Sequence, residues 1–236
     1  LSKNKADELW TRIEPFAAYG FNKAHAASYG RVAYQTAFMK ANYPVAYITA
    51  ILTNESGDIE KISEIVGECK RMGIEVLPPD VNYSGGGFEI IENKEDKKEE
   101  IRFGLYTIKN LGKDIADAII AEREKNGKYK TFEEFLERVT HKNLTKKSLE
   151  ALSMCGAFDE LVERNLVINN IEDILEYHKD VIKDNSMQDS LFGNMGPSKF
   201  TFKNTTVATA DQKLKWEKEL LGLYISGFPL DPWKKR

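Results

Sequence analysis

A turn and a helix start near the beginning of the chain bring together groups that could bind an anion. The stretch Gly20-Phe21-Asn22-Lys23-Ala24-His25 precedes a long helical pattern. Gly20 permits a sharp turn, and Asn22 can cap the backbone N–H groups of the first helical turn. Lys23 and His25 lie where the helix dipole is positive, which favours an anion such as a phosphate. The alternative is that Asn22 only caps the helix and Lys23 is only solvated, since capped helix starts with a lysine are common.

A second group of residues predicts contact with a phosphate backbone. Residues Ile108–Ile119 have the pattern of a helix, a tight hairpin and a second helix. This is the shape of a helix-hairpin-helix element, in which hairpin amides and a helix N-terminus meet a DNA phosphate. Lys109 and Lys113 would add positive charge, and Gly112 and Asn110 would form the turn. The motif usually has glycine at the position of Asn110, but asparagine tolerates the left-handed conformation well. Taken alone, the pattern fits a plain helix turn equally well.

The segment 142–147 occupies the place of a second hairpin without a glycine, and we interpret it as structural with a basic rim.

A third group lies in a segment without hydrophobic periodicity. In Gln188-Asp189-Ser190-Leu191-Phe192 two large apolar residues stand side by side with no evident core to join. A pocket on a partner protein could take Leu191 and Phe192, while Gln188 forms a hydrogen bond at its rim. As a bare pattern this pentapeptide arises often by chance.

Composition limits the class of protein. The formal net charge is −3, from 34 basic and 37 acidic side chains, so DNA contact would have to be local rather than a general basic coat. Cys69 and Cys155 have no CxxC spacing, which indicates buried thiols in a reducing, cytoplasmic compartment. No apolar run approaches the length of a membrane span, and no signal peptide opens the chain. Because Leu1 falls within a helical pattern, we expect a piece of a longer protein.

No catalytic residue and no metal site is predicted. The histidines at 25, 141 and 178 are far apart in the sequence, without a ligand partner at helical spacing. No pair of aspartates stands at the end of a convincing strand, as a two-metal phosphoryl-transfer site would need.

Hydrophobic periodicity predicts a mainly α fold with one small β-hairpin and an extended linker. Helices are expected over 3–17, 23–42, 59–72, 165–183 and 211–224, and hairpin strands over 88–91 and 101–103. Thr131 and Thr145 are predicted to cap short helices, Thr131 through a capping box with Glu134. Side chains at helical spacing are expected in the core, namely Phe38, Tyr43, Tyr47 and Met72.

Several blocks in one order resemble the bacterial replicative DNA polymerase III alpha subunits. The blocks are 20–27, 34–37, 40–44, 68–74, 77–82, 103–105, 149–152, 155–159 and 219–227. The resemblance implies the end of a fingers domain over 1–80, a β-hairpin connector over 81–104, a tandem helix-hairpin-helix-like DNA-binding module over 105–183, a flexible linker over 184–210, and a helix over 211–236 leading to a nucleic-acid-binding barrel.

The same resemblance implies roles for the residues already singled out. Asn22, Lys23 and His25 would contact the phosphates of the incoming dNTP, and the 108–119 hairpin would contact primer-template DNA. The pentapeptide resembles the peptide that binds the bacterial sliding clamp, the beta subunit, and other replisome subunits are expected partners. Magnesium would be held by the palm, which would lie upstream of Leu1, so this chain alone is expected to be inactive. The alternative is a stand-alone, non-enzymatic adaptor that binds DNA and the clamp.

Overall fold

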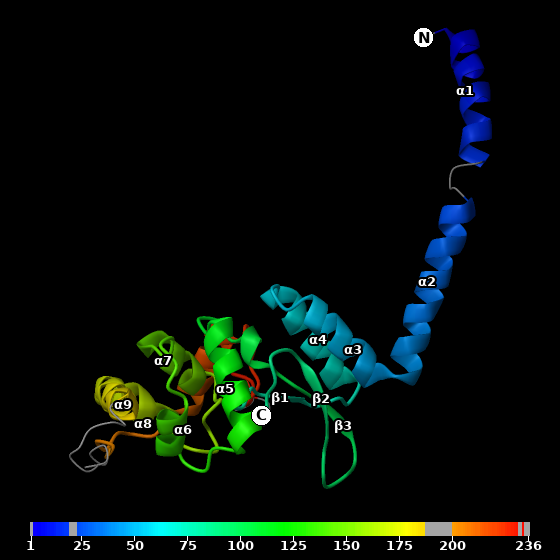
Figure 1. Ribbon diagram of the computed structural model, residues 1–236. Coiled ribbons are helices and arrows are strands. Elements are labelled where there is room, and N and C mark those ends of the chain that lie inside the picture. Colours follow the sequence, from blue (N-terminus) through cyan, green and yellow to red (C-terminus); the bar gives the residue numbers. More distant parts are fainter. Residues whose placement is uncertain (1, 19–22, 187–199, 231–232, 234–236) are drawn as a thin grey trace. The chain divides into compact units, whose positions relative to one another are not determined.

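The chain forms two compact units. The computed structural model describes residues 2–18, 23–186, 200–230 and 233. The units are Leu1–Tyr47 and Ile48–Arg236, and the division falls within helix α3 (Pro44–Asn54). The fingers segment predicted over 1–80 is a different kind of division, and its residues 48–80 fall within the second unit. The mainly α fold class is confirmed, with one small sheet (Figure 1). No helix in the described part of the chain is long and apolar enough to span a membrane.

The first unit contains helices α1 (Lys3–Ala18) and α2 (Lys23–Asn42). Among their described side chains none is buried. Phe38 and Tyr43, which were predicted to be core residues, are 48% and 57% exposed, and Met72 of the second unit is 36% exposed. That prediction was wrong for these three, because helical spacing identifies an apolar face but not what covers it. Tyr47 is half-buried.

Helix α4 (Ile59–Arg71) follows its predicted pattern closely. The Asp58 carboxylate accepts a hydrogen bond from the Lys61 N–H and caps the first turn. Ile62 and Cys69 are buried on one face, and Gly73 ends the helix with φ of +71°.

The predicted hairpin is part of a three-stranded sheet with strand order β1-β3-β2. Strands β2 (Glu89–Glu92) and β3 (Glu99–Arg102) pair antiparallel, with Ile90 opposite Ile101. The sequence prediction missed β1 (Val76–Leu77), which pairs parallel to β3. Two residues are too few to show an alternating pattern, so only the tertiary contact reveals this strand.

Helices then build the rest of the second unit (Figure 1). They are η1 (Leu105–Thr107, a 3-10 turn), α5 (Lys113–Asn126), α6 (Phe132–Arg138), α7 (Lys146–Met154), α8 (Arg164–Asn169), α9 (Ile171–Ser186) and α10 (Ala210–Leu220). Helix α7 contacts α8, α9 and α10. In the core, the rings of Tyr129, Phe132, Phe135 and Phe158 pack against one another, edge to face or stacked.

The single helix predicted over 165–183 is in fact two helices that meet at Asn170. The Asn170 amide nitrogen donates to the carbonyls of Leu166 and Lys203, and its oxygen accepts from the Lys203 N–H. The asparagine therefore ends α8 and fixes a distant segment at the same time.

The predicted linker is held in place over its last part. Residues 200–209 have no regular secondary structure, yet Phe200 and Phe202 pack together and reach the rings of Tyr177 and Phe132. The Ala208 N–H donates to the Glu163 carboxylate. The prediction of a flexible linker over 184–210 is therefore wrong for these residues, and 187–199 lie outside the described residues.

One predicted cap forms only in part. Thr131 accepts a hydrogen bond from the Glu134 N–H and caps α6. The Glu134 carboxylate accepts from the Lys130 N–H instead of from Thr131, so the predicted capping box is incomplete.

Candidate nucleic-acid interface

The four residues predicted to contact DNA lie in the turn that follows η1 and at the start of α5: Lys109, Asn110, Gly112 and Lys113, the last being the first residue of α5. The element before the hairpin is a single 3-10 turn rather than the predicted helix. Asn110 has φ of +69°, so it takes the left-handed conformation that the sequence indicated. The Leu111 N–H donates to the Ile108 carbonyl at 3.2 Å and closes the turn.

The N-terminus of α5 is open. Its N-cap residue, Gly112, forms no side-chain cap hydrogen bond, and nothing lies within 4 Å of the place where a Cβ would be. Gly112 has φ of −69°, so its backbone does not require glycine. The missing side chain instead leaves the first-turn N–H groups of α5 accessible to an anion, where the helix dipole is positive.

The second predicted hairpin differs in this respect. The N-terminus of α7 carries a complete capping box, in which Thr145 and Ser148 each accept from the other's backbone N–H. The Lys146 ammonium pairs with Glu172 at 2.6 Å. The first-turn amides of α7 are thus already capped by side chains, which agrees with the structural role expected for this segment.

Contacts from two sides fix the first hairpin. The Lys109 N–H donates to the carbonyl of Leu220, the last residue of α10, at 3.1 Å. The Lys113 ammonium lies 5.2 Å from the centre of the Tyr106 ring, and the Tyr106 hydroxyl donates to Asp117. The side chains of Lys109 and Lys113 are both exposed, so they can meet a phosphate.

A buried ion pair that sequence reasoning missed holds α10 in place. Arg164 is 3% exposed, and its guanidinium donates to Glu217 at 3.2 Å, to Asp159 at 2.7 Å and to the Met154 carbonyl at 2.9 Å. The second Glu217 oxygen accepts from the N–H groups of Ile225 and Ser226, both at 3.0 Å. Both charged residues fall in ordinary helical sequence, so no local signal identifies them.

The other predicted site residues are either in the first unit or outside the described residues. Lys23 and His25 lie in the first turn of α2, in the first unit, where the His25 ring lies 4.1 Å from that of Tyr29. Asn22 lies outside the described residues. So do the three pentapeptide residues, Gln188, Leu191 and Phe192.

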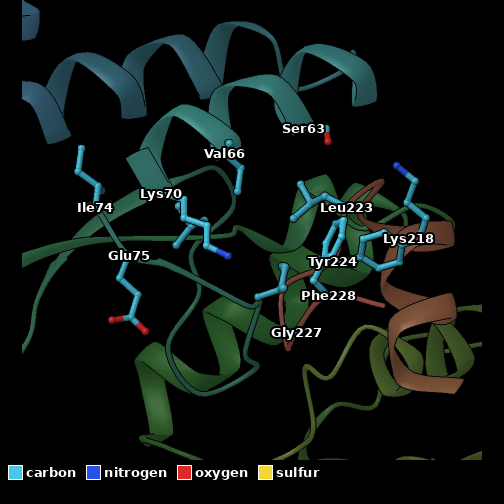
Figure 2. Close-up of a pocket in the computed structure, with 13 residues that line it drawn as sticks. Ser63, Val66, Lys70, Ile74, Glu75, Lys218, Leu223, Tyr224, Gly227 and Phe228 are labelled. Atoms are coloured by element: carbon cyan, nitrogen blue, oxygen red, sulfur yellow. The ribbon is translucent and has the colours of Figure 1, made fainter. Parts of the chain in front are cut away.

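A cavity of about 600 Å³ lies between α4 and the segment after α10. Its walls are mostly apolar, and Figure 2 shows the Lys70 side chain extending toward this segment while the Glu75 carboxylate points away. Lys218, on the facing wall, donates to the Gly222 carbonyl at 2.8 Å. The polar side chains of its lining are those of Ser63, Lys70, Glu75, Lys218 and Tyr224.

Other titratable groups are structural. Burial raises the pKa of Cys69 to about 11 and that of Cys155 to about 12, so both thiols stay protonated and buried as predicted. Burial lowers the pKa of His178, whose ring nitrogen lies 2.9 Å from the Val139 carbonyl. Within residues 2–18, 23–186, 200–230 and 233, no group of three or more His, Cys, Asp or Glu side chains could hold a metal ion.

Comparison with protein families supports the interpretation of residues 108–119 as a helix-hairpin-helix element. A family described as "Helix-hairpin-helix motif" matches residues 73–166, which include the Lys109–Lys113 hairpin and both capped helix starts at α6 and α7. This match covers the part of the second unit where the open helix start lies.

Curated relatives match nearly the whole chain. DNA polymerase III subunit alpha from Borreliella burgdorferi is 42% identical over 99% of this chain, and the one from Deinococcus radiodurans is 40% identical over 97%. The protein of the same name from Thermus aquaticus is 37% identical over 97% of the chain. The chain spans only 17–20% of the length of these relatives.

Proposed function

We propose, because this chain belongs to the DNA polymerase III subunit alpha family, that it serves as the duplex-binding segment of a replicative DNA polymerase. The parent would add nucleotides from dNTPs to a primer, with magnesium held in a palm outside this sequence. The observation that carries the proposal is the open N-terminus of α5 beside two exposed lysines. Such a site binds phosphate oxygens and reads no bases, which suits an enzyme that must copy any sequence.

Replacing Gly112 by serine tests the hairpin contact without damaging the helix. Serine is at least as good an N-cap as glycine, so we expect stability to be kept or slightly raised. Its hydroxyl would accept a first-turn N–H and stand where the phosphate must approach, so duplex affinity should fall about tenfold, the loss of one charge-assisted hydrogen bond. Fluorescence anisotropy with a labelled duplex at two salt concentrations measures this, since counterion release makes affinity fall as salt rises.

Thr145→Ser is the matched control, because it keeps a capping hydroxyl at the start of α7. It should leave duplex affinity unchanged. Equal duplex binding by Gly112→Ser and the parent chain would remove the hairpin from the proposed interface.

We also propose that Asn22, Lys23 and His25 contact the triphosphate of the incoming dNTP in the parent polymerase. Lys23 and His25 lie in the first turn of α2, where the dipole favours an anion. In a polymerase that carries this segment, Lys23→Ala should raise the KM for dNTP or lower kcat. The resulting fall in kcat/KM should correspond to about 1.5–3 kcal/mol. Steady-state kinetics with dNTP as the varied substrate measures the effect, with Lys5→Ala in α1 as control. Unchanged kinetics would mean that Lys23 is only a solvated residue at a helix start.

Gln188, Leu191 and Phe192 are proposed to bind a sliding clamp. Burying two large apolar side chains contributes roughly 3–6 kcal/mol before the cost of ordering the peptide, which suggests micromolar affinity. Calorimetry of a peptide spanning 187–193 with the clamp should show saturable binding, and Leu191→Ala with Phe192→Ala should remove it. The absence of heat and saturation at high micromolar peptide would make the pentapeptide a coincidence.

The alternative is a stand-alone adaptor that binds DNA and the clamp without catalysis. The reading frame upstream of Leu1 separates the two proposals, because a palm with paired aspartates encoded there excludes the adaptor. The exposed apolar side chains of α1 and α2 favour the polymerase, since large apolar surfaces usually have a partner.

A further inference from the structure

A loop next to the hairpin presents a tyrosine between two cations. Tyr83 is 41% exposed, with the Lys128 ammonium 3.4 Å and the Arg102 guanidinium carbon 5.2 Å from the centre of its ring. The loop is rigid because the Arg123 guanidinium donates to the carbonyls of Val81 and Ser84, at 3.0 and 2.7 Å. The ring therefore has a fixed place on the surface.

A second tyrosine lies close by and carries a third cation. Tyr106 is 42% exposed and has the Lys113 ammonium 5.2 Å from its ring centre. Its backbone N–H donates to the Gly86 carbonyl at 2.9 Å, and a Cβ on Gly86 would lie 2.3 Å from its ring. Only two residues lie between Tyr83 and Gly86, and the three steps along the chain span at most about 10 Å. The two tyrosines are thus close in space, and we call them and their cations the tyrosine strip: Tyr83, Arg102, Tyr106, Lys113 and Lys128.

We propose that the tyrosine strip binds single-stranded DNA, such as an unpaired template. Exposed aromatic rings interleaved with basic side chains are what a single strand needs, because bases stack on the rings and phosphates meet the cations. Duplex DNA cannot use the rings, since its bases are already stacked and paired. The inference goes beyond the proposed duplex contact, with which it shares only Lys113.

The charges around the tyrosine strip are compatible with a polyanion. Among the described residues, three carboxylates lie near it and each accepts a hydrogen bond: Glu89 from the Gly85 N–H at 3.1 Å, Asp117 from the Tyr106 hydroxyl, and the buried Asp80, which also interacts with Arg102 and Lys128, from the Asn82 N–H at 2.6 Å. The lysines over the rings are exposed, and cation–π contacts at exposed sites are weak. A base can therefore displace an ammonium from a ring face, and the ammonium can move to the adjoining phosphate.

The test measures anisotropy of the 236-residue chain with a labelled oligothymidine and, separately, with a blunt duplex of the same length. Tyr83→Leu and Tyr106→Leu keep apolar bulk but remove the stacking surface, and each should weaken single-strand binding about five- to hundredfold. Duplex affinity should change less than twofold in Tyr83→Leu, because no contact of Tyr83 holds the hairpin. Tyr83→Phe and Tyr106→Phe keep the ring and should retain single-strand affinity. Tyr34→Leu, which removes a tyrosine that is 71% exposed, is the control and should have no effect.

A pair of lysines tests the electrostatic part. Lys128→Ala should weaken single-strand binding and reduce its salt dependence more than Lys125→Ala, since both lysines are exposed but only Lys128 lies over Tyr83. Full single-strand affinity in the Tyr83→Leu, Tyr106→Leu double variant would overturn the inference. An equal loss of duplex and single-strand binding in Tyr83→Leu alone would overturn it too. Neither result tests the duplex proposal, which depends on the Gly112→Ser variant alone.

Discussion

Glu217→Ala is expected to lower the free energy of unfolding by about 3–5 kcal/mol, the usual cost of breaking a buried ion pair from one side. Glu217 is 2% exposed and Arg164 is 3% exposed, so the guanidinium would keep only Asp159 and a backbone carbonyl as partners. The N–H groups of Ile225 and Ser226 would also lose their acceptor. Urea unfolding followed by circular dichroism measures the loss.

Glu172→Ala provides the matched control for this change. Glu172 also pairs with a basic side chain, Lys146, but the two side chains are 76% and 51% exposed. Exposed pairs contribute about 0–1 kcal/mol, so this variant should unfold nearly as the parent chain does. Similar losses in the two variants would show that the Arg164–Glu217 pair is not a central support of α10.

Gly104→Ala is expected to destabilise the second unit by about 1–3 kcal/mol, the range for overpacked sites, or more. A Cβ at Gly104 would lie 2.0 Å from the Gly87 carbonyl oxygen and 2.3 Å from that of Gly86. Both are backbone atoms, so no side-chain rotation can relieve the clash. The same unfolding measurement applies, and duplex binding should weaken with it, because Gly104 precedes the η1 turn that leads into the hairpin.

Gly87→Ala is the control for Gly104→Ala. Gly87 faces Gly104, yet nothing lies within 4 Å of the place where its own Cβ would be. We expect this variant to keep the stability of the parent chain to within about 0.5 kcal/mol, as for most surface changes. Equal stability of the Gly104 and Gly87 variants would mean that the two loops can separate at no cost.

Local sequence determined those features whose causes lie within a few residues. The caps at Asp58 and Thr145, the apolar stripe of α4 and the left-handed Asn110 all depend on neighbours at most four positions away. The β2–β3 hairpin is local for the same reason, since a short connection joins its strands. The sequence also placed Lys109, Asn110, Gly112 and Lys113 in one turn, and the structure agrees.

Tertiary structure decided what depends on residues far apart in the chain. The helix break at Asn170 comes from hydrogen bonds to Lys203, and the fixed path of 200–209 comes from the aromatic cluster and Glu163. Periodicity records which face of an element is apolar, but the partner that covers a face or satisfies a buried charge is chosen by the whole fold.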